Sequence, residues 1–402
     1  MGRIHSDRNA GYIELGVNVV MKVLITGIGG FVGSRLADTI LTRGTRKDVN
    51  SWEVYGVVRR HSKYEYPPNL TELGIERQVN LLYGDIKDGP RMKAVMAEVK
   101  PDIVFHLAAQ AYVPDSYANP TETYVTNING TQNILEAMKE SCNKDVPFVF
   151  AGSSEEYGAV KLEDLPLNEN SPRKPISPYG VTKVVGEDFC IAYHKMYGMN
   201  TIRSRAFNHE GAGRGDMYVT SKIAKRVCEN KVLTLGNVCA FRDWSHIHDI
   251  CNGYIHLAEH GKAGEVYVQG SGEMYSVLSY ALMSLKDKHG DIVNMDVSHP
   301  GDRTIKFSMD DPLSDRAEPP FNNAIDQMIG RGFLELPQAT SIGVTTENGI
   351  IRHIYLDPIH YRPLDVPYLL ADASKIGLKH KHSIKDIISD LINYHDDRKG
   401  WC

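Results

Sequence analysis

Short apolar, β-branched runs alternate with stretches of helical periodicity over roughly the first half of the chain. The pattern predicts strands at 19–26, 53–59, 79–83, 102–107, 147–152 and 201–206. Apolar residues spaced three and four apart predict helices at 31–42, 121–139 and 179–197. Alternation of this kind indicates an α/β fold with a Rossmann-like, doubly wound parallel sheet that helices cover on both faces. Ligands of such folds bind beyond the carboxyl ends of the strands.

The pattern loosens after residue 210. Short strands at 232–235 and 265–268 mix with helices, including one at 383–394. We therefore expect two domains, a dinucleotide-binding domain at 21–210 and a smaller C-terminal α/β substrate lobe at 211–402 that closes over the sheet.

Two segments fall outside this division. Residues 1–20 are expected to be an N-terminal extension. Residues 296–350 are punctuated by proline and glycine around one short helix, and we interpret them as an unusual insertion in the lobe.

Composition excludes several classes of protein. The net charge is −5 with acids and bases interspersed, which argues against nucleic-acid binding. Apolar stretches are shorter than the roughly 20 residues of a membrane span, and the first twenty residues lack the features of a signal peptide. The six cysteines are scattered without metal-ligand spacing, so we expect reduced thiols, no metal site and a cytoplasmic protein.

A glycine-rich segment directly follows the first predicted strand. Gly27, Gly30 and Gly33 are spaced for a tight turn and close backbone approach, and Phe31 and Val32 open the next helix. The amino terminus of that helix would face a phosphate. The segment therefore predicts a dinucleotide site.

Two further segments bear on the cofactor. The second strand ends in Arg59 and Arg60, where an acid would favour NAD; two arginines instead suit the 2′-phosphate of NADP. The alternative is a solvated strand end. Asp85 and Ile86 follow the third strand, where the acid could meet the adenine or could be a plain turn residue.

The pair Tyr-x-x-x-Lys suits hydride-transfer chemistry, because a helix places both side chains on one face. The pattern occurs four times, starting at Tyr83, Tyr157, Tyr179 and Tyr218. Only Tyr179 opens the helix between the fifth and sixth strands, so Tyr179 and Lys183 are the predicted pair. The lysine and a nicotinamide cation should lower the pKa of Tyr179.

The fifth strand leads into Ser153, Glu155 and Glu156. Ser153 could share a proton with Tyr179. Glu155, if desolvated, could remove a proton next to a ketone. The alternative for Glu155 is a solvated turn acid, and Glu156 is a fair candidate for that role.

Together these motifs resemble the extended short-chain dehydrogenases that act on nucleotide sugars. The resemblance includes His106–Gln110 and Asn127. Within that group, Asn208–Glu210, Arg214-Gly215, Arg242–Trp244 and 361–366 are similar to GDP-mannose 4,6-dehydratases. The resemblance covers roughly 21–295 and 350–395. It implies NADP contacts at Leu107, Ala108 and Ala109, and GDP-sugar contacts at Asn208, Glu210, Lys222, Arg242 and Arg362.

The resemblance implies dehydration of a GDP-hexose, with Tyr179 as base toward O4, Glu155 as base at C5, Ser153 as proton donor and Lys183 as orienting cation. Segment 152–158 looks equally like GDP-4-keto-6-deoxymannose reductases, and a 4-epimerase would need only the Tyr–Lys pair. A non-catalytic dinucleotide-binding regulator is a fourth alternative. A homodimer or homotetramer is the default assembly.

Overall fold

The computed structural model describes residues 20–44, 52–63, 65–301, 304–307, 313 and 317–398. The expected N-terminal extension, apart from Val20, and Cys402 lie outside the described residues.

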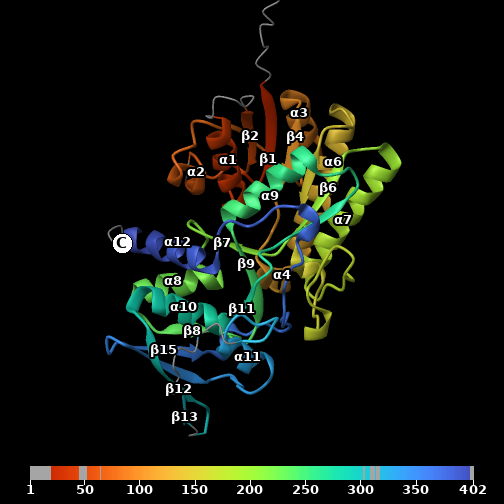
Figure 1. The fold of residues 1–402 in the computed structure, drawn as a ribbon. Coiled ribbons are helices and arrows are strands. Elements are labelled where there is room, and N and C mark those ends of the chain that lie inside the picture. The colour runs from red at the N-terminus through yellow and green to blue at the C-terminus, as the bar shows by residue number, and fades with distance from the viewer. Residues whose placement is uncertain are drawn as a thin grey trace, which may run out of the picture.

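A seven-stranded parallel sheet forms the upper part of the molecule in Figure 1, in the order β10-β6-β5-β4-β1-β2-β3. Its strands are β1 (Met21–Thr26), β2 (Trp52–Val58), β3 (Asn80–Tyr83), β4 (Ile103–His106), β5 (Phe148–Ala151), β6 (Thr201–Ala206) and β10 (Val266–Gln269). All six predicted strands of the first half are present, with ends shifted by at most two residues. The seventh comes from beyond residue 210 and pairs with β6.

Helices cover both faces of this sheet, which confirms the doubly wound, Rossmann-like fold. On one face, α1 (Phe31–Gly44) and α9 (Ile247–His260) pack in a buried cluster with Val23 of β1. On the other, α3 (Gly89–Val99), α6 (Gly130–Ser141) and α7 (Pro178–Tyr197) pack with Leu24. Adjacent residues of one strand serve opposite cores because side chains alternate along a strand.

The helix predicted at 121–139 is interrupted. It consists of α5 (Pro120–Tyr124), a π-helical turn at Val125–Asn129, and α6. The wider turn accompanies a buried Asn127, whose amide nitrogen donates to Gln110 O (3.1 Å) and Thr182 Oγ1 (2.9 Å). Sequence periodicity could not show this interruption, because it serves contacts to other segments.

The lower part of Figure 1 contains two smaller sheets. One has the order β11-β9-β7 and the other β13-β12-β14-β15-β8. Their strands are β7 (Asn208–Glu210), β8 (Leu233–Leu235), β9 (Phe241–His246), β11 (Met274–Ser276), β12 (Ile292–Ser298), β13 (Thr304–Phe307), β14 (Ser341–Thr346) and β15 (Ile351–Leu356). The helices here are α8 (Val219–Cys228), α10 (Val277–His289), α11 (Ala324–Gly330) and α12 (Ile384–Asp397).

Residues 296–350 hold more structure than the expected single helix. β12, which continues to residue 298, pairs antiparallel with β14, with Val297 opposite Ile342 and Met295 opposite Val344. These four side chains are buried in the core beneath the sheet. Sequence analysis missed the pairing of these two strands, although burial of one face gives each strand alternating apolar positions.

No helix of the described ranges is long and apolar enough to cross a membrane. The five cysteines among these residues are free thiols.

Candidate active site

The glycine loop between β1 and α1 leaves no room for side chains. Gly27 has a φ of +77°, and a Cβ there would lie 2.8 Å from the backbone nitrogen of Ala108. A Cβ on Gly33 would lie 2.2 Å from Gly27 O. Gly30 N donates to Gly27 O (3.0 Å), and α1 then begins at Phe31, followed by Val32. The first N–H groups of a helix have no partner within it, so this cradle fits a diphosphate.

The ends of β2 and β3 lie side by side. Arg59 and Arg60 directly follow β2, are exposed, and make no ion pair with the residues that the structure describes. Arg60 lies over the ring of Tyr83, 4.9 Å from its centre. Asp85 accepts a bond from the backbone of Lys87 (2.9 Å), the contact of a turn residue. Contacts of Asp85 and Ile86 with an adenine remain a prediction.

Leu107, Ala108 and Ala109 follow β4 and face the glycine loop. Ala108 N donates to Thr26 Oγ1 (3.2 Å), and the same hydroxyl lies 2.8 Å from His106 Nδ1. Burial, and next the charge of Lys183, lower the pKa of His106 to about 3. A neutral imidazole therefore ties the carboxyl ends of β1 and β4 together.

Three of the predicted catalytic side chains meet at the carboxyl end of β5. Ser177 caps α7 by accepting from Gly180 N (3.0 Å), so the helix begins at Pro178 and places Tyr179 in its first turn. The hydroxyls of Ser153 and Tyr179 are hydrogen-bonded to each other. Lys183 Nζ donates to Ala151 O (2.6 Å) and lies 5.6 Å from the centre of the Tyr179 ring. All three side chains are buried.

The other three tyrosines of the repeated pattern lie elsewhere. Tyr83 is exposed at the end of β3, and Tyr157 donates its hydroxyl to Asn168 O (2.8 Å). Tyr218 caps α8 and stacks against Arg214, whose guanidinium carbon is 3.4 Å from the ring centre. Of the four, Tyr179 alone joins both a serine hydroxyl and a buried lysine.

The pKa of Tyr179 differs in direction from our expectation. Burial raises the pKa of this phenol, and the hydrogen bond from Ser153 opposes the rise only in part. Burial also lowers the pKa of Lys183 to about 8, against the charge of Glu156. The groups of the protein alone therefore favour the neutral phenol, because desolvation outweighs the hydrogen bond from Ser153.

Glu155 lies in the turn that follows β5, near both Tyr179 and Arg242. It is partly buried, and Ser177 Oγ donates to its Oε2 at 3.5 Å. Its charge acts electrostatically on Tyr179 and on Arg242. The carboxylate is thus placed to reach a ligand held between them.

The expectation of a solvated Glu156 was wrong. This side chain is fully buried; its Oε1 accepts from Ser153 N (2.9 Å) and its Oε2 lies 3.6 Å from Arg205 Nε. Burial, and next the neighbouring Glu187, raise its pKa to about 8. The 3₁₀ turn at Ser154–Glu156 points successive side chains in different directions, which adjacency in sequence cannot show.

Arg242, a predicted substrate contact, is buried on β9. Its guanidinium donates to Val366 O (2.7 Å) and Asp365 Oδ1 (2.9 Å). Sequence analysis missed the role of Asp365, although it lies within the quoted segment 361–366. Arg362, by contrast, is exposed.

The remaining predicted substrate residues lie on β7 and α8. Asn208 is half-buried on β7, and Lys222 Nζ lies 3.1 Å from His360 Nε2. Glu210 is buried, accepts from Thr220 Oγ1 (2.7 Å), and lies 3.2 Å from Arg214 Nε. Its carboxylate is thus engaged within the protein, and a substrate contact there remains a prediction.

Arg214 provides a link that sequence analysis missed. Its guanidinium carbon lies 5.0 Å from the ring centre of Phe31, in the first turn of α1. The segment that follows β7 therefore contacts the first turn of α1, at the end of the glycine loop.

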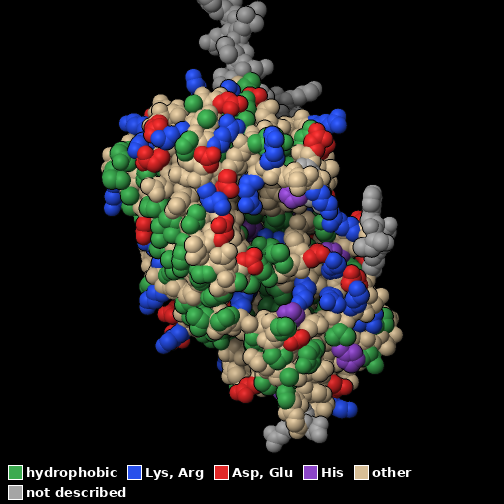
Figure 2. All heavy atoms as spheres, turned by 180° about the vertical axis from the view of Figure 1, so that it is seen from behind, with side chains coloured by type: hydrophobic (Ala, Val, Ile, Leu, Met, Phe, Trp, Pro, Cys, Tyr) green, Lys and Arg blue, Asp and Glu red, His purple; other side chains and the backbone are tan. Residues whose placement is uncertain are grey.

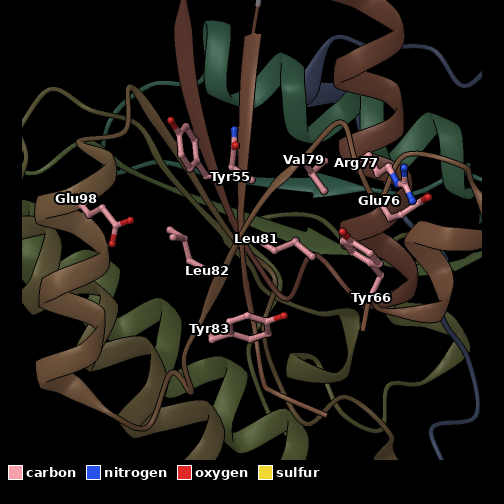
Figure 3. A pocket seen from close by; sticks show the side chains of 10 residues that line it. Tyr55, Tyr66, Glu76, Arg77, Val79, Leu81, Leu82, Tyr83 and Glu98 are labelled. Atoms are coloured by element: carbon pink, nitrogen blue, oxygen red, sulfur yellow. The ribbon is translucent and has the colours of Figure 1, made fainter. Parts of the chain in front are cut away.

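Seen from behind, the molecule is hollowed midway down its face, with hydrophobic and basic side chains around the hollow (Figure 2). A separate hollow of about 510 Å³ lies along the free edge of β3, where Tyr55, Tyr66 and Tyr83 contribute to its walls (Figure 3). Ser153, Tyr179 and Lys183 do not line that second hollow. No cluster of three or more metal-ligating side chains suited to an ion occurs in the described part of the chain.

Comparison with known proteins identifies a family. The model of the family described as GDP-mannose 4,6 dehydratase matches residues 24–312. A GDP-mannose 4,6-dehydratase of Vibrio cholerae serotype O1 is 28% identical over 387 residues, covering 92% of each chain. The Homo sapiens GDP-mannose 4,6 dehydratase is 28% identical over 409 residues, covering 97% of this chain and 95% of the human one.

Solved structures share the fold. The structure of RMD from Pseudomonas aeruginosa, complexed with NADPH, has a TM-score of 0.62 at 22% identity and covers 94% of this chain and 99% of its own. A dTDP-glucose 4,6-dehydratase from Streptomyces venezuelae, with NAD bound, has a TM-score of 0.70 at 21% identity, with coverage of 95% and 98%.

Proposed function

Because the chain belongs to the GDP-mannose 4,6-dehydratase family, we propose that it dehydrates a GDP-hexose, GDP-mannose in the first instance, to a GDP-4-keto-6-deoxyhexose. The observation that carries this proposal is the convergence of Ser153, Tyr179 and Lys183 at the end of β5, with Glu155 beside them. A hydride-transfer site needs the first three; an elimination also needs a base at the neighbouring carbon.

We propose NADP as the cofactor. The loop at Gly27–Gly33 fits the diphosphate of a nicotinamide dinucleotide, and the exposed guanidinium groups of Arg59 and Arg60 support a 2′-phosphate. NADP bound there would supply the acceptor for the hydride of C4 and the donor of that hydride to C6.

The protein's own residues move the protons. Tyr179, ionised in the complex, takes the proton of O4, while Lys183 orients the nicotinamide ribose and holds the phenolate. Glu155 removes the proton from C5, which the 4-ketone has acidified. Ser153 or Glu155 protonates the departing O6, so that water leaves, and a proton returns to C5 when hydride reaches C6. Arg242 and Arg362 hold the diphosphate of the substrate, with Lys222, Asn208 and Glu210 nearby.

We further propose a cytoplasmic, symmetric homo-oligomer. The five free cysteines among the described residues support a reducing compartment.

The experiment is incubation of the purified protein with GDP-mannose and other GDP- and UDP-sugars. GDP-mannose should lose one water, with no net consumption of cofactor and with deuterium from solvent at C5. An epimerase would give product of unchanged mass. A protein that ignores GDP-mannose but oxidises NADPH with a 4-keto substrate would be a reductase, and that result would overturn the proposal.

A further inference from the structure

Two basic side chains that form no ion pair with the described residues lie on α8, although Asp357 acts electrostatically on Lys222, and Glu229 and Arg226 act on each other. Lys222 and Arg226 are four residues apart on this helix, and both are half-buried. Lys222 Nζ lies 3.1 Å from Nε2 of His360. The guanidinium of Arg226 makes no hydrogen bond or ion pair with any residue of the described ranges.

This arrangement is unfavourable for the protein alone. Like charges four residues apart on a helix repel each other. An ammonium can only donate, so His360 must accept through Nε2 and stay neutral. Burial, and next the charge of Arg226, lower the pKa of Lys222, and the charge of Asp357 opposes this only in part. A ligand rich in acceptor atoms would relieve this repulsion.

The neighbouring lysines are paired, which sets Lys222 and Arg226 apart. Lys225 lies 2.5 Å from Asp216, and Lys231 lies 3.0 Å from Glu229. Together these residues and the unpaired two line a hollow of about 340 Å³. The positive charge of this hollow is therefore concentrated at Lys222 and Arg226, while its other basic residues are each paired with a carboxylate.

The hollow lies at the end of the proposed substrate site that is farther from Tyr179. Segment 357–366 runs from His360, beside Lys222, through Arg362 to Asp365, which binds Arg242. Arg242 in turn feels the charge of Glu155. A sugar nucleotide with its hexose at Tyr179 and its diphosphate at Arg242 therefore directs its base toward α8.

We propose that Arg226, supported by Lys222, recognises the guanine base of the substrate; this inference rests on the proposed function. The planar guanidinium fork matches O6 and N7 of guanine, two adjacent acceptors. Adenine presents a donor beside N7, and uracil lacks the paired acceptors. Arg226 is thus a specificity-determining residue for GDP-sugars.

Calorimetric titration of GDP, UDP and ADP into the full-length protein tests this assignment. Arg226→Gln should weaken GDP binding by about tenfold or more and leave UDP and ADP within about twofold. Arg226→Lys keeps the charge without the fork and should fall between the wild type and Arg226→Gln. Lys93→Gln removes one charge from α3, where Glu140 already pairs it, and should change none of the affinities.

An equal loss for all three nucleotides in Arg226→Gln would overturn the inference, since it would indicate a phosphate contact. Unchanged GDP binding in both Arg226 variants would also overturn it. If the wild type binds none of the nucleotides, the proposed function itself fails, and the two failures are thereby distinguished.

Discussion

Glu156 makes the stability of the protein depend on pH in a predictable way. Its pKa is about 8 in the folded chain against an ordinary value of 4.5. A carboxyl with a raised pKa stabilises the fold fully below its unfolded pKa, and this contribution is lost as pH rises toward the folded pKa. The free energy of unfolding should therefore carry a falling component from Glu156 between pH 4.5 and 8.

Glu156→Gln isolates that component. The amide oxygen can still accept from Ser153 N, as Oε1 does at 2.9 Å, but the side chain no longer ionises. A single proton difference changes stability by about 1.4 kcal/mol per pH unit, an upper bound because Glu187 shares the same cations. Relative to the wild type, the free energy of unfolding of the variant should increase by about 1 kcal/mol per pH unit between pH 5 and 8.

Urea denaturation followed by tryptophan fluorescence at four pH values measures the difference. Glu155→Gln is the matched control, because it makes the same change one residue away, on a side chain that is only partly buried. Parallel pH dependences of the wild type and Glu156→Gln would refute the reasoning, since they would mean that Glu156 is ionised in the fold.

Three further predictions concern the reaction. The wild type should bind NADP(H) more tightly than NAD(H) by fluorescence titration, and Arg59→Asp should weaken NADP(H) by about ten- to a hundredfold; equal wild-type affinities would contradict the cofactor proposal. Tyr179→Phe should lower turnover by several orders of magnitude with GDP-sugar binding retained, whereas Tyr83→Phe, on an exposed ring, should stay near normal. Glu155→Gln should still oxidise C4 and accumulate the absorbance of reduced nicotinamide without losing water, and undiminished dehydration by this variant would exclude Glu155 as the base.

The alternating pattern predicted most of the Rossmann-like sheet, because buried parallel strands are short apolar runs and crossover helices have their own period. The glycine loop was equally legible, since only glycine tolerates the positive φ of Gly27 and the close approach at Gly33. Tyr179 was separable from Tyr83, Tyr157 and Tyr218 by its place between two strands. In each case, the prediction depends only on residues that are close together in the sequence.

Contacts between distant segments could be decided only by the tertiary structure. Residues 342 and 344 look unremarkable until β14 pairs with β12, and β10 joins the main sheet although it follows β6 by sixty residues. A strand's partners depend on where the chain returns, which local periodicity does not encode.

The same holds for the electrostatics of the site. Sequence determined which polar residues were available: Ser153, Glu155, Glu156, Tyr179 and Lys183. Tertiary structure decided that Glu156 lies beneath the turn while Glu155 lies in the site, and that burial raises the pKa of Tyr179. The reason is that a pKa depends on desolvation and on charges brought close by folding, and both are properties of the packed molecule rather than of the chain.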